Sequence, residues 1–219
     1  QMQVPAYKIA SFEVVDLPLI EIAARTGKPL IISTGMATID EIDEAVAAAC
    51  GAGATQVALL KCTSAYPAPP EEVHLRAIPQ LADTFQVPVG LSDHTLGFAV
   101  PVAAVGLGAC LVEKHMTLSR NIPSPDAAFS LEPNEFAAMV EAIRQVEKAL
   151  GQATPTLGVQ EARSRAFRRS LFVVKDVKAG EVFTHETVRS IRPGHGLPPK
   201  FLQHVLGQRA AVDIVRGTP

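Results

Sequence analysis

The stretches VPVGLSDH at 87–94 and ACLVEKH at 109–115 decide the fold of this chain. Each is an apolar run that ends in a polar cluster with one histidine, His94 or His115. The two histidines are 21 residues apart, and a Gly- and Ala-rich apolar stretch of helical character separates them. In a chain of strand–helix units this is the distance from one strand end to the next. We therefore expect the two imidazoles at neighbouring strand ends, where they can bind one metal ion.

Working outward, five apolar runs of this kind recur along the first two thirds of the chain. Strands that are apolar on both faces and alternate with helices are typical of parallel β/α architecture. Polar residues collect where the runs end, as on the catalytic face of a (β/α)8 barrel or the ligand edge of an open sheet. No GxGxxG motif or P-loop follows any run, which disfavours a dinucleotide-binding fold. The three earlier runs are AYKIAS at 6–11, PLIIST at 29–34 and QVALLKCT at 56–63.

The segments between the runs have helical periodicity and recognisable start signals. Residues 38–51 have one apolar face, and Thr38 with Glu41 matches a capping box. Pro70, followed by two glutamates, predicts the start of another helix. A long amphipathic helix is expected over about 132–150, ending at Gly151.

The pattern changes after Gly151. Residues 152–169 are polar, contain Pro155 and a run of arginines, and are expected to form a linker. Residues 170–219 read as short strands punctuated by Gly and Pro, which indicates a small β-rich domain. A complete barrel has eight strands. We therefore expect 1–151 to be the C-terminal portion of a longer barrel.

Composition narrows the class of protein. The 219 residues are 47% apolar and 19% charged, and mean hydropathy is +0.20, so the chain can bury a core. A net charge of −2 gives no general reason to expect nucleic acid or an anionic membrane as a partner. The three cysteines lack CxxC spacing and indicate free thiols in a reducing cytosol. With no signal peptide and no apolar stretch of about 20 residues, we expect a cytoplasmic protein.

Several motifs make the chain similar to the sialic acid synthase family. RSLFVVKDVKAGEVFT and RSIRPGHGL resemble the antifreeze-like (SAF) domain at the C-terminus of that family. Within the family the chain looks most like the pseudaminic acid synthases, with neuraminic and legionaminic acid synthases next. The barrel motifs that carry the resemblance are YKIASFE at 7–13, STGMA at 33–37, LLKCTSAYPAP at 59–69, GLSDHTLG at 90–97, EKHMTLSR at 113–120 and PDAAFSL at 125–131.

The resemblance implies a reaction and its components. Phosphoenolpyruvate would condense with the aldehyde of an acetamido sugar, 2,4-diacetamido-2,4,6-trideoxy-altrose, and phosphate would leave by C–O cleavage. It also implies a divalent metal (Mn2+, Mg2+ or Co2+) and a domain-swapped homodimer in which the SAF domain of one subunit covers the partner's barrel. The alternatives are N-acetylneuraminate or legionaminate synthase, or a catalytically inactive truncated fragment. The family's first three strands have no counterpart here, and the SAF domain stops short of its usual end, so we expect this chain alone to be inactive.

The resemblance also assigns candidate site residues, and the chemistry of each suits its role. His94 and His115 would be catalytic and would hold the metal; Glu13 is a further acid in the pocket. Asp93 and Glu113, next to the histidines, are expected to orient the imidazoles. Taken singly, these residues also fit structural histidines, strand-end caps, loop acids and a turn arginine. The substrate-binding set is Lys8, Ser11, Ser33 and Ser92 for phosphate, Ser64 and Tyr66 for the sugar or carboxylate, Asp126 for sugar hydroxyls and Arg192 for the acetamido group.

The loop that carries Asp126 departs from the family pattern. Ser124 stands where a glycine is common, and Ala127 stands where a serine is common. Both departures bear on the conformation of the loop around Asp126.

Overall fold

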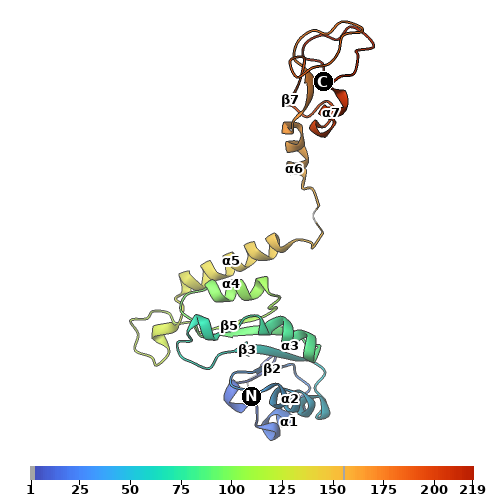
Figure 1. The fold of residues 1–219 in the computed structure, drawn as a ribbon. Coiled ribbons are helices and arrows are strands. Elements are labelled where there is room, and N and C mark those ends of the chain that lie inside the picture. The colour runs from blue at the N-terminus through green and yellow to red at the C-terminus, as the bar shows by residue number, and fades with distance from the viewer. Residues whose placement is uncertain (1–2, 155) are drawn as a thin grey trace. The chain divides into compact units, whose positions relative to one another are not determined.

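Five parallel strands form the sheet of the first unit, in the order in which they occur along the chain (Figure 1). Each lies inside one of the five apolar runs, so the strand prediction is confirmed. The computed structural model describes residues 3–154 and 156–219, and Pro155 of the predicted linker lies outside them. The strands are β1 (Tyr7–Ile9), β2 (Leu30–Ser33), β3 (Val57–Cys62), β4 (Val89–Asp93) and β5 (Val112–Lys114).

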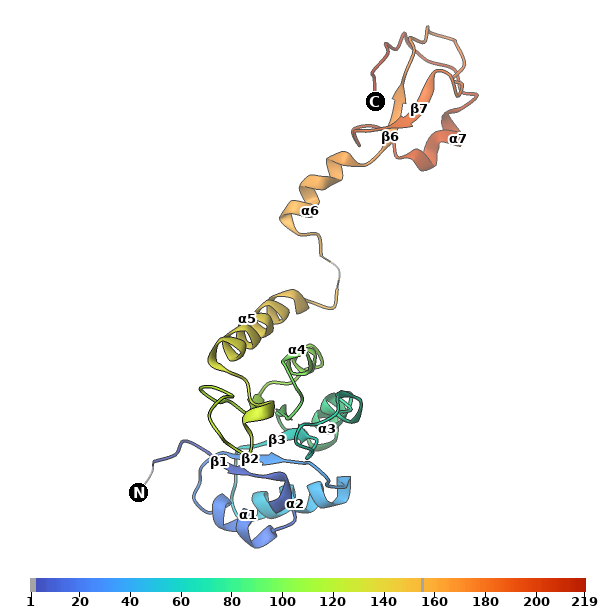
Figure 2. The ribbon, with the colours of Figure 1, turned by 90° about the vertical axis from the view of Figure 1, so that its left-hand side faces the viewer.

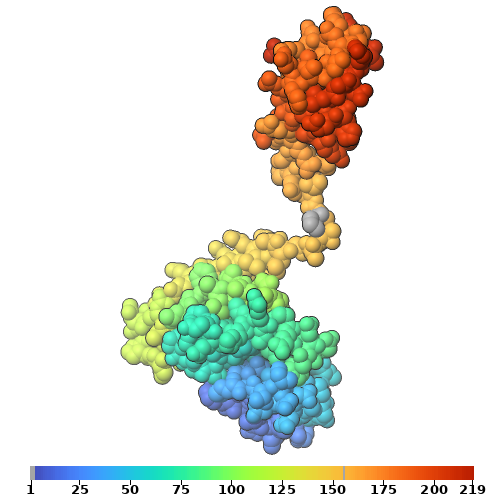
Figure 3. Space-filling model, in the orientation of Figure 1, coloured from blue at the N-terminus to red at the C-terminus, as the bar shows by residue number. Residues whose placement is uncertain are grey.

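The sheet winds in one direction and is strongly curved. A doubly wound sheet reverses its strand order, and this sheet does not. Lys8 on β1 and Glu113 on β5 form an ion pair, with 3.2 Å between Nζ and Oε1. In a flat sheet, four strand spacings of about 4.8 Å would hold these outermost strands roughly 19 Å apart. Curvature of this kind is that of a (β/α)8 barrel wall. On the surface of the first unit, the colours run in chain order from blue through green to yellow (Figure 3).

Helices cover one face of the sheet (Figure 2). Alternate residues of the strands, such as Ile32, Leu59 and Leu91, pack with helix residues in one buried apolar cluster. The other set of alternate residues faces the concave side, as the period of two along a strand requires. None of the helices among residues 3–154 and 156–219 has the length and apolar character to cross a membrane. The helices are α1 (Leu17–Ala24), α2 (Ile39–Gly51), α3 (Ala77–Phe85), α4 (Ala99–Gly106) and α5 (Pro133–Leu150).

Two helix predictions are confirmed and one is wrong. The capping box of α2 is present, because Thr38 and Glu41 each bind the other's backbone N–H. The long helix α5 spans the predicted segment. Pro70, however, begins only a 3-10 turn, Pro70–Glu72, and α3 starts later. His74 has a φ of 49°, and a left-handed residue cannot continue a right-handed helix.

The second compact unit, Gln152–Pro219, has its own small core. Strands β6 (Ser170–Val173) and β7 (Val188–Ile191) pair antiparallel. A short helix, α7 (Leu202–Val205), follows them. Part of the expected linker is helical, since α6 spans Val159–Ser164. The buried apolar residues of this unit are Leu171, Val173, Val177, Val188 and Ala210.

Gly90 on β4 tests the account of the curved sheet. A Cβ at this position would overlap the carbonyl oxygen of Leu111 and lie 2.7 Å from Cδ2 of Leu60. We expect Gly90→Ala to lower the free energy of unfolding by about 1–3 kcal/mol, as overpacking typically does. Urea unfolding of the chain measures this difference.

Gly106, in α4, is the matched control. A Cβ there meets nothing within 4 Å, and alanine is better than glycine inside a helix. Gly106→Ala should leave the free energy of unfolding unchanged or raise it. A Gly90→Ala variant as stable as the wild type would contradict the close packing on the concave face.

Candidate active site

The ends of β4 and β5 bring His94 and His115 together. Their ring centroids lie 5.2 Å apart, with 60° between the ring planes. Each histidine directly follows its strand, and Asp93 and Lys114 are register partners at the last paired position. His94 is buried, whereas His115 is half-buried.

In both rings, Nδ1 lies near an oxygen atom. Nδ1 of His94 lies 2.9 Å from the carbonyl oxygen of Thr63, so it carries the hydrogen and donates it. This leaves Nε2 of His94 with its lone pair, the state in which an imidazole binds metal. Nδ1 of His115 lies 3.5 Å from a carboxylate oxygen of Asp126. The groups that orient the imidazoles are therefore Thr63 and Asp126.

Neither Asp93 nor Glu113 hydrogen-bonds an imidazole directly. Asp93 points to the face opposite His94, because successive side chains of a strand alternate. Its carboxylate pairs with Lys114. Oε1 of Glu113 accepts a hydrogen bond of 2.7 Å from Ser92 and pairs with Lys8. Glu113 therefore holds two of the predicted phosphate-binding groups in place.

Aromatic rings form a wall beside the histidines. The ring of Tyr66 lies 4.3 Å from that of His94, between centroids, and Phe129 lies 5.0 Å from His115. Burial raises the pKa of the Tyr66 phenol, and the charges of Cys62, Asp126 and Glu113 add to this effect. Tyr66 thus stays protonated and can donate a hydrogen bond at neutral pH.

Three predicted serines lie close to the end of β2. Ser11 accepts a hydrogen bond of 3.0 Å from the backbone N–H of Gly35. A Cβ at Gly35 would collide with the hydroxyls of Ser64 and Ser11, so only glycine fits between them. Ser33 is buried, and its hydroxyl has no hydrogen-bond partner among the described residues. Unsatisfied buried hydroxyls are uncommon and point to a missing ligand or water.

Cys62, at the end of β3, was not foreseen as a site residue. Its Sγ lies 3.8 Å from the Ser64 hydroxyl and 3.9 Å from Nδ1 of His94. Burial alone would raise the pKa of this thiol, but hydrogen bonds to His94, Ser11 and Ser64 and the charge of His94 lower it to about 7. The signal that could have found it is the strand period, which puts Cys62 and Ser64 on the same face.

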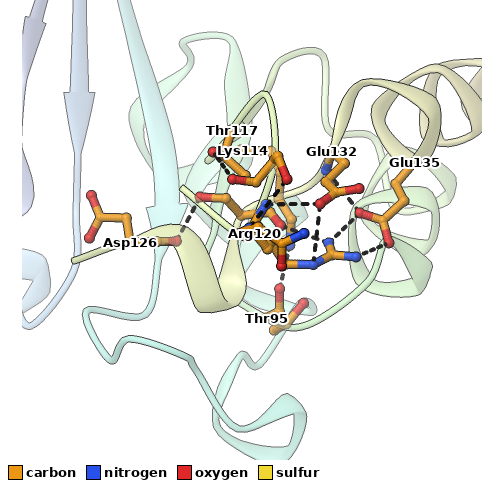
Figure 4. A network of polar contacts seen from close by, with 10 residues as sticks. Thr95, Lys114, Thr117, Arg120, Asp126, Glu132 and Glu135 are labelled. Carbon is orange, nitrogen blue, oxygen red and sulfur yellow. Dashed lines mark hydrogen bonds and ion pairs between the residues drawn. The ribbon is translucent and has the colours of Figure 1, made fainter. Parts of the chain in front are cut away.

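A polar network shapes the loop that carries Asp126 (Figure 4). Arg120 pairs with Glu135 through both terminal nitrogens, and it also donates to the carbonyl oxygen of Ser130. Ser130 in turn donates to the carbonyl oxygen of Asp126 at 2.7 Å. A 3-10 turn, Ala127–Phe129, follows Asp126 directly. The two departures from the family pattern are thus accommodated in an ordered loop.

Two predicted residues are not brought into contact with this cluster. Glu13 lies in the 3-10 turn Ser11–Glu13 after β1, and its side chain makes no hydrogen bond or ion pair within the part of the chain described. Arg192 belongs to the second unit, where it is exposed and directly follows β7. The remaining predicted residues lie within the strands of the first unit or in the segments that follow them, with Asp126 in the loop after β5.

The histidine pair fits a divalent cation by its donor chemistry. Within residues 3–154 and 156–219, no group of three or more His, Cys, Asp or Glu side chains is arranged to hold a metal ion. Two imidazole nitrogens are nevertheless available, and the polar groups around them are the thiol of Cys62 and oxygen atoms such as those of Thr63 and Asp126. A site with two protein nitrogens leaves coordination positions open for water and substrate oxygens.

The thiol of Cys62 provides a pH test of this geometry. In metal-free protein, we expect its thiolate absorbance near 240 nm to appear with a midpoint at about pH 7. Subtracting the titration of Cys62→Ser isolates this step from Cys50 and Cys110. Because the folded pKa lies below the ordinary thiol value of 9.0, Cys62 stabilises the fold at high pH, and this stabilisation is lost as pH falls through about 7. A midpoint for Cys62 near 9 would contradict the contacts with His94 and Ser64.

Known proteins resemble this chain over both of its units. A pseudaminic acid synthase of Helicobacter pylori is 45% identical over 98% of the chain, which spans 64% of that protein. An N,N'-diacetyllegionaminic acid synthase of Campylobacter jejuni is 41% identical over 93% of the chain and 62% of that protein. The crystal structure of an N-acetylneuraminic acid synthetase from Leptospira borgpetersenii has a TM-score of 0.69 and 34% identity, and the match covers 74% of this chain and 56% of that one.

Two family models divide the chain between them. The model of the NeuB family matches residues 1–155, and the model of the SAF domain matches residues 168–219. The curved five-stranded sheet corresponds to part of a (β/α)8 barrel, and the antiparallel β6–β7 pair belongs to the SAF domain. This chain therefore belongs to the NeuB family.

Proposed function

We propose that this chain is the site-bearing part of a nonulosonic acid synthase of the pseudaminic type. The substrates are phosphoenolpyruvate and 2,4-diacetamido-2,4,6-trideoxy-altrose, and the products are pseudaminic acid and phosphate. C3 of phosphoenolpyruvate bonds to the aldehyde carbon, water adds to C2, and the C2–O bond to phosphate breaks. The observation that carries the proposal is the pair of imidazoles, whose ring centroids lie 5.2 Å apart. Nδ1 of His94 contacts the carbonyl oxygen of Thr63, and Nδ1 of His115 contacts the carboxylate of Asp126.

In this proposal His94 and His115 bind a divalent cation, Mn2+, Mg2+ or Co2+. Such an ion acts, when bound, as a Lewis acid toward the aldehyde oxygen. The carbonyl of Thr63 and the carboxylate of Asp126 keep the two rings oriented before substrate arrives. Burial and the charge of His94 lower the pKa of His115, which favours its neutral form.

The phosphate group of phosphoenolpyruvate is proposed to bind at the ends of β1, β2 and β4. Lys8 supplies the cation, and the hydroxyls of Ser11, Ser33 and Ser92 supply donors from separate strands. Leaving a hydroxyl such as that of Ser33 unsatisfied costs about 1–3 kcal/mol, so a phosphate oxygen there would be favourable. Glu113 already holds Lys8 and Ser92 at this position.

The sugar is proposed to lie against the aromatic wall of Tyr66 and Phe129. Ser64 and Asp126 would bind its polar groups, and Glu13 is the further carboxylate at the same strand ends. Arg192 of the partner subunit would bind the acetamido carbonyl, for which a guanidinium is well suited. In this dimer the SAF domain of one subunit covers the other's barrel. The excess of acidic residues in the first unit and of basic residues in the second favours that pairing.

Choice of sugar separates this proposal from its nearest alternatives. The 41% identity to a legionaminic acid synthase supports a legionaminate synthase as the second candidate. We expect phosphate release only when phosphoenolpyruvate and Mn2+ are combined with the altrose derivative. The assay uses the protein expressed from its complete reading frame, with the sugars of the neuraminate and legionaminate reactions as comparisons. Release with N-acetylmannosamine alone would make the pseudaminic assignment wrong, and no release with any sugar would favour the inactive alternative.

The histidine pair gives the second test of function. Replacing His94 with alanine removes a proposed metal ligand, and partners of ligands alone are typically worth 10–100-fold. We therefore expect His94→Ala to lower the rate of phosphate release by at least about 100-fold. His74→Asn is the control, since His74 lies outside the site and asparagine tolerates its positive φ. Equal rates for His94→Ala and the wild type would exclude the proposed role.

A further inference from the structure

A buried ion pair lies directly behind the two histidines. Nζ of Lys114 is 2.6 Å from Oδ2 of Asp93, and both side chains have 0% exposure. The two residues are register partners on neighbouring strands. Neither belongs to the residues proposed above to bind substrate or metal, so the function assigned to the site leaves this pair unexplained.

The same pair fixes the turn that carries His94. Asp93 accepts hydrogen bonds from the backbone N–H and the hydroxyl of Thr95, at 3.2 and 3.0 Å to Oδ1. Lys114 donates a second hydrogen bond, to the carbonyl oxygen of Thr95. Figure 4 shows Lys114 and Thr95 within this network. His94 lies between two residues that are both tied to Lys114, and its own carbonyl accepts from the N–H of Ala68 at 2.9 Å.

The sequence positions make the pair a cross-link between the two ligand-bearing segments. His94 follows Asp93, and His115 follows Lys114. Any shift of one strand end relative to the other would change the distance between the imidazoles and would also break the Asp93–Lys114 contact. The ion pair therefore couples the position of one histidine to that of the other.

Stability alone is a weak reason for such a pair. Two buried charges lose their hydration, and an apolar or neutral replacement of a buried pair is often as stable. We propose that Asp93 and Lys114 are positioning residues, which set the separation and orientation of His94 and His115. The inference that the site binds a cation rests on the proposed function, whereas the positioning of the rings does not.

The test separates positioning from stability. Lys114→Met leaves Asp93 buried and unpaired and should destabilise the fold strongly. In the double variant Asp93→Asn/Lys114→Met no unpaired charge remains, so most of the stability should return in urea unfolding. Mn2+ affinity, measured by electron paramagnetic resonance, should remain about 10–100-fold weaker than in the wild type. Leu81→Ala, buried in α3, is the control that loses stability without changing Mn2+ affinity.

A second readout does not depend on metal. In the metal-free wild type, nitrogen NMR should show His94 in the single tautomer with hydrogen on Nδ1, as its contact with Thr63 requires. The double variant should show a mixture of tautomers. If the wild type binds no Mn2+, the metal part of the proposed function is wrong, and the tautomer comparison still decides the positioning role.

Thr95→Val is the milder variant if the double variant does not fold. It removes only the hydroxyl that donates a hydrogen bond to Asp93. This variant should weaken Mn2+ binding a few-fold and broaden the tautomer signal of His94. Wild-type Mn2+ affinity together with an unchanged His94 signal, in whichever of the two variants folds, would overturn the proposal and leave the pair a purely structural one.

Discussion

The alternation of side chains along curved parallel strands is the constraint on which the site depends. One face of each strand packs against the helices, and the residues between must point to the concave side. Curvature then brings side chains from β1 and β5 into contact, as the Lys8–Glu113 pair shows. It also crowds the interior, and this is why Gly35 and Gly90 have no room for a Cβ. Five separate strand ends thus contribute to one small polar region.

The surroundings of the two histidines shift their pKa values in opposite directions. Burial lowers the pKa of His94, but hydrogen bonds to Cys62 and Thr63 outweigh it, and the net pKa is raised. For His115, burial and the charge of His94 lower the pKa. Protonation of His94 therefore favours the folded state below its folded pKa, whereas the cost of charging His115 grows as pH falls below 6.5.

Periodicity was sufficient to predict the five strands and the helices α2 and α5, and spacing was sufficient to predict the neighbouring histidines. The start of α3 was not predictable, because the left-handed conformation of His74 has no clear residue signature. The contacts of Asp93 and Glu113 could not be predicted, because adjacency in sequence does not reveal the face to which a side chain points. The Thr63 carbonyl could not be foreseen either, since any residue offers a carbonyl. Such contacts depend on the three-dimensional path of the chain.

The two halves of the site differ in how firmly they are held. His94 is fixed by a fully buried ion pair and by backbone hydrogen bonds. Asp126, the partner of Nδ1 of His115, depends on a loop whose main clasp, the ion pair Arg120–Glu135, is exposed and therefore screened by salt. Hydrogen bonding to Arg120 lowers the pKa of Glu135 to about 2, so the clasp persists at acidic pH and is weakened chiefly by ionic strength. Changes in this loop can therefore alter the surroundings of Asp126 without removing the contacts that hold His94.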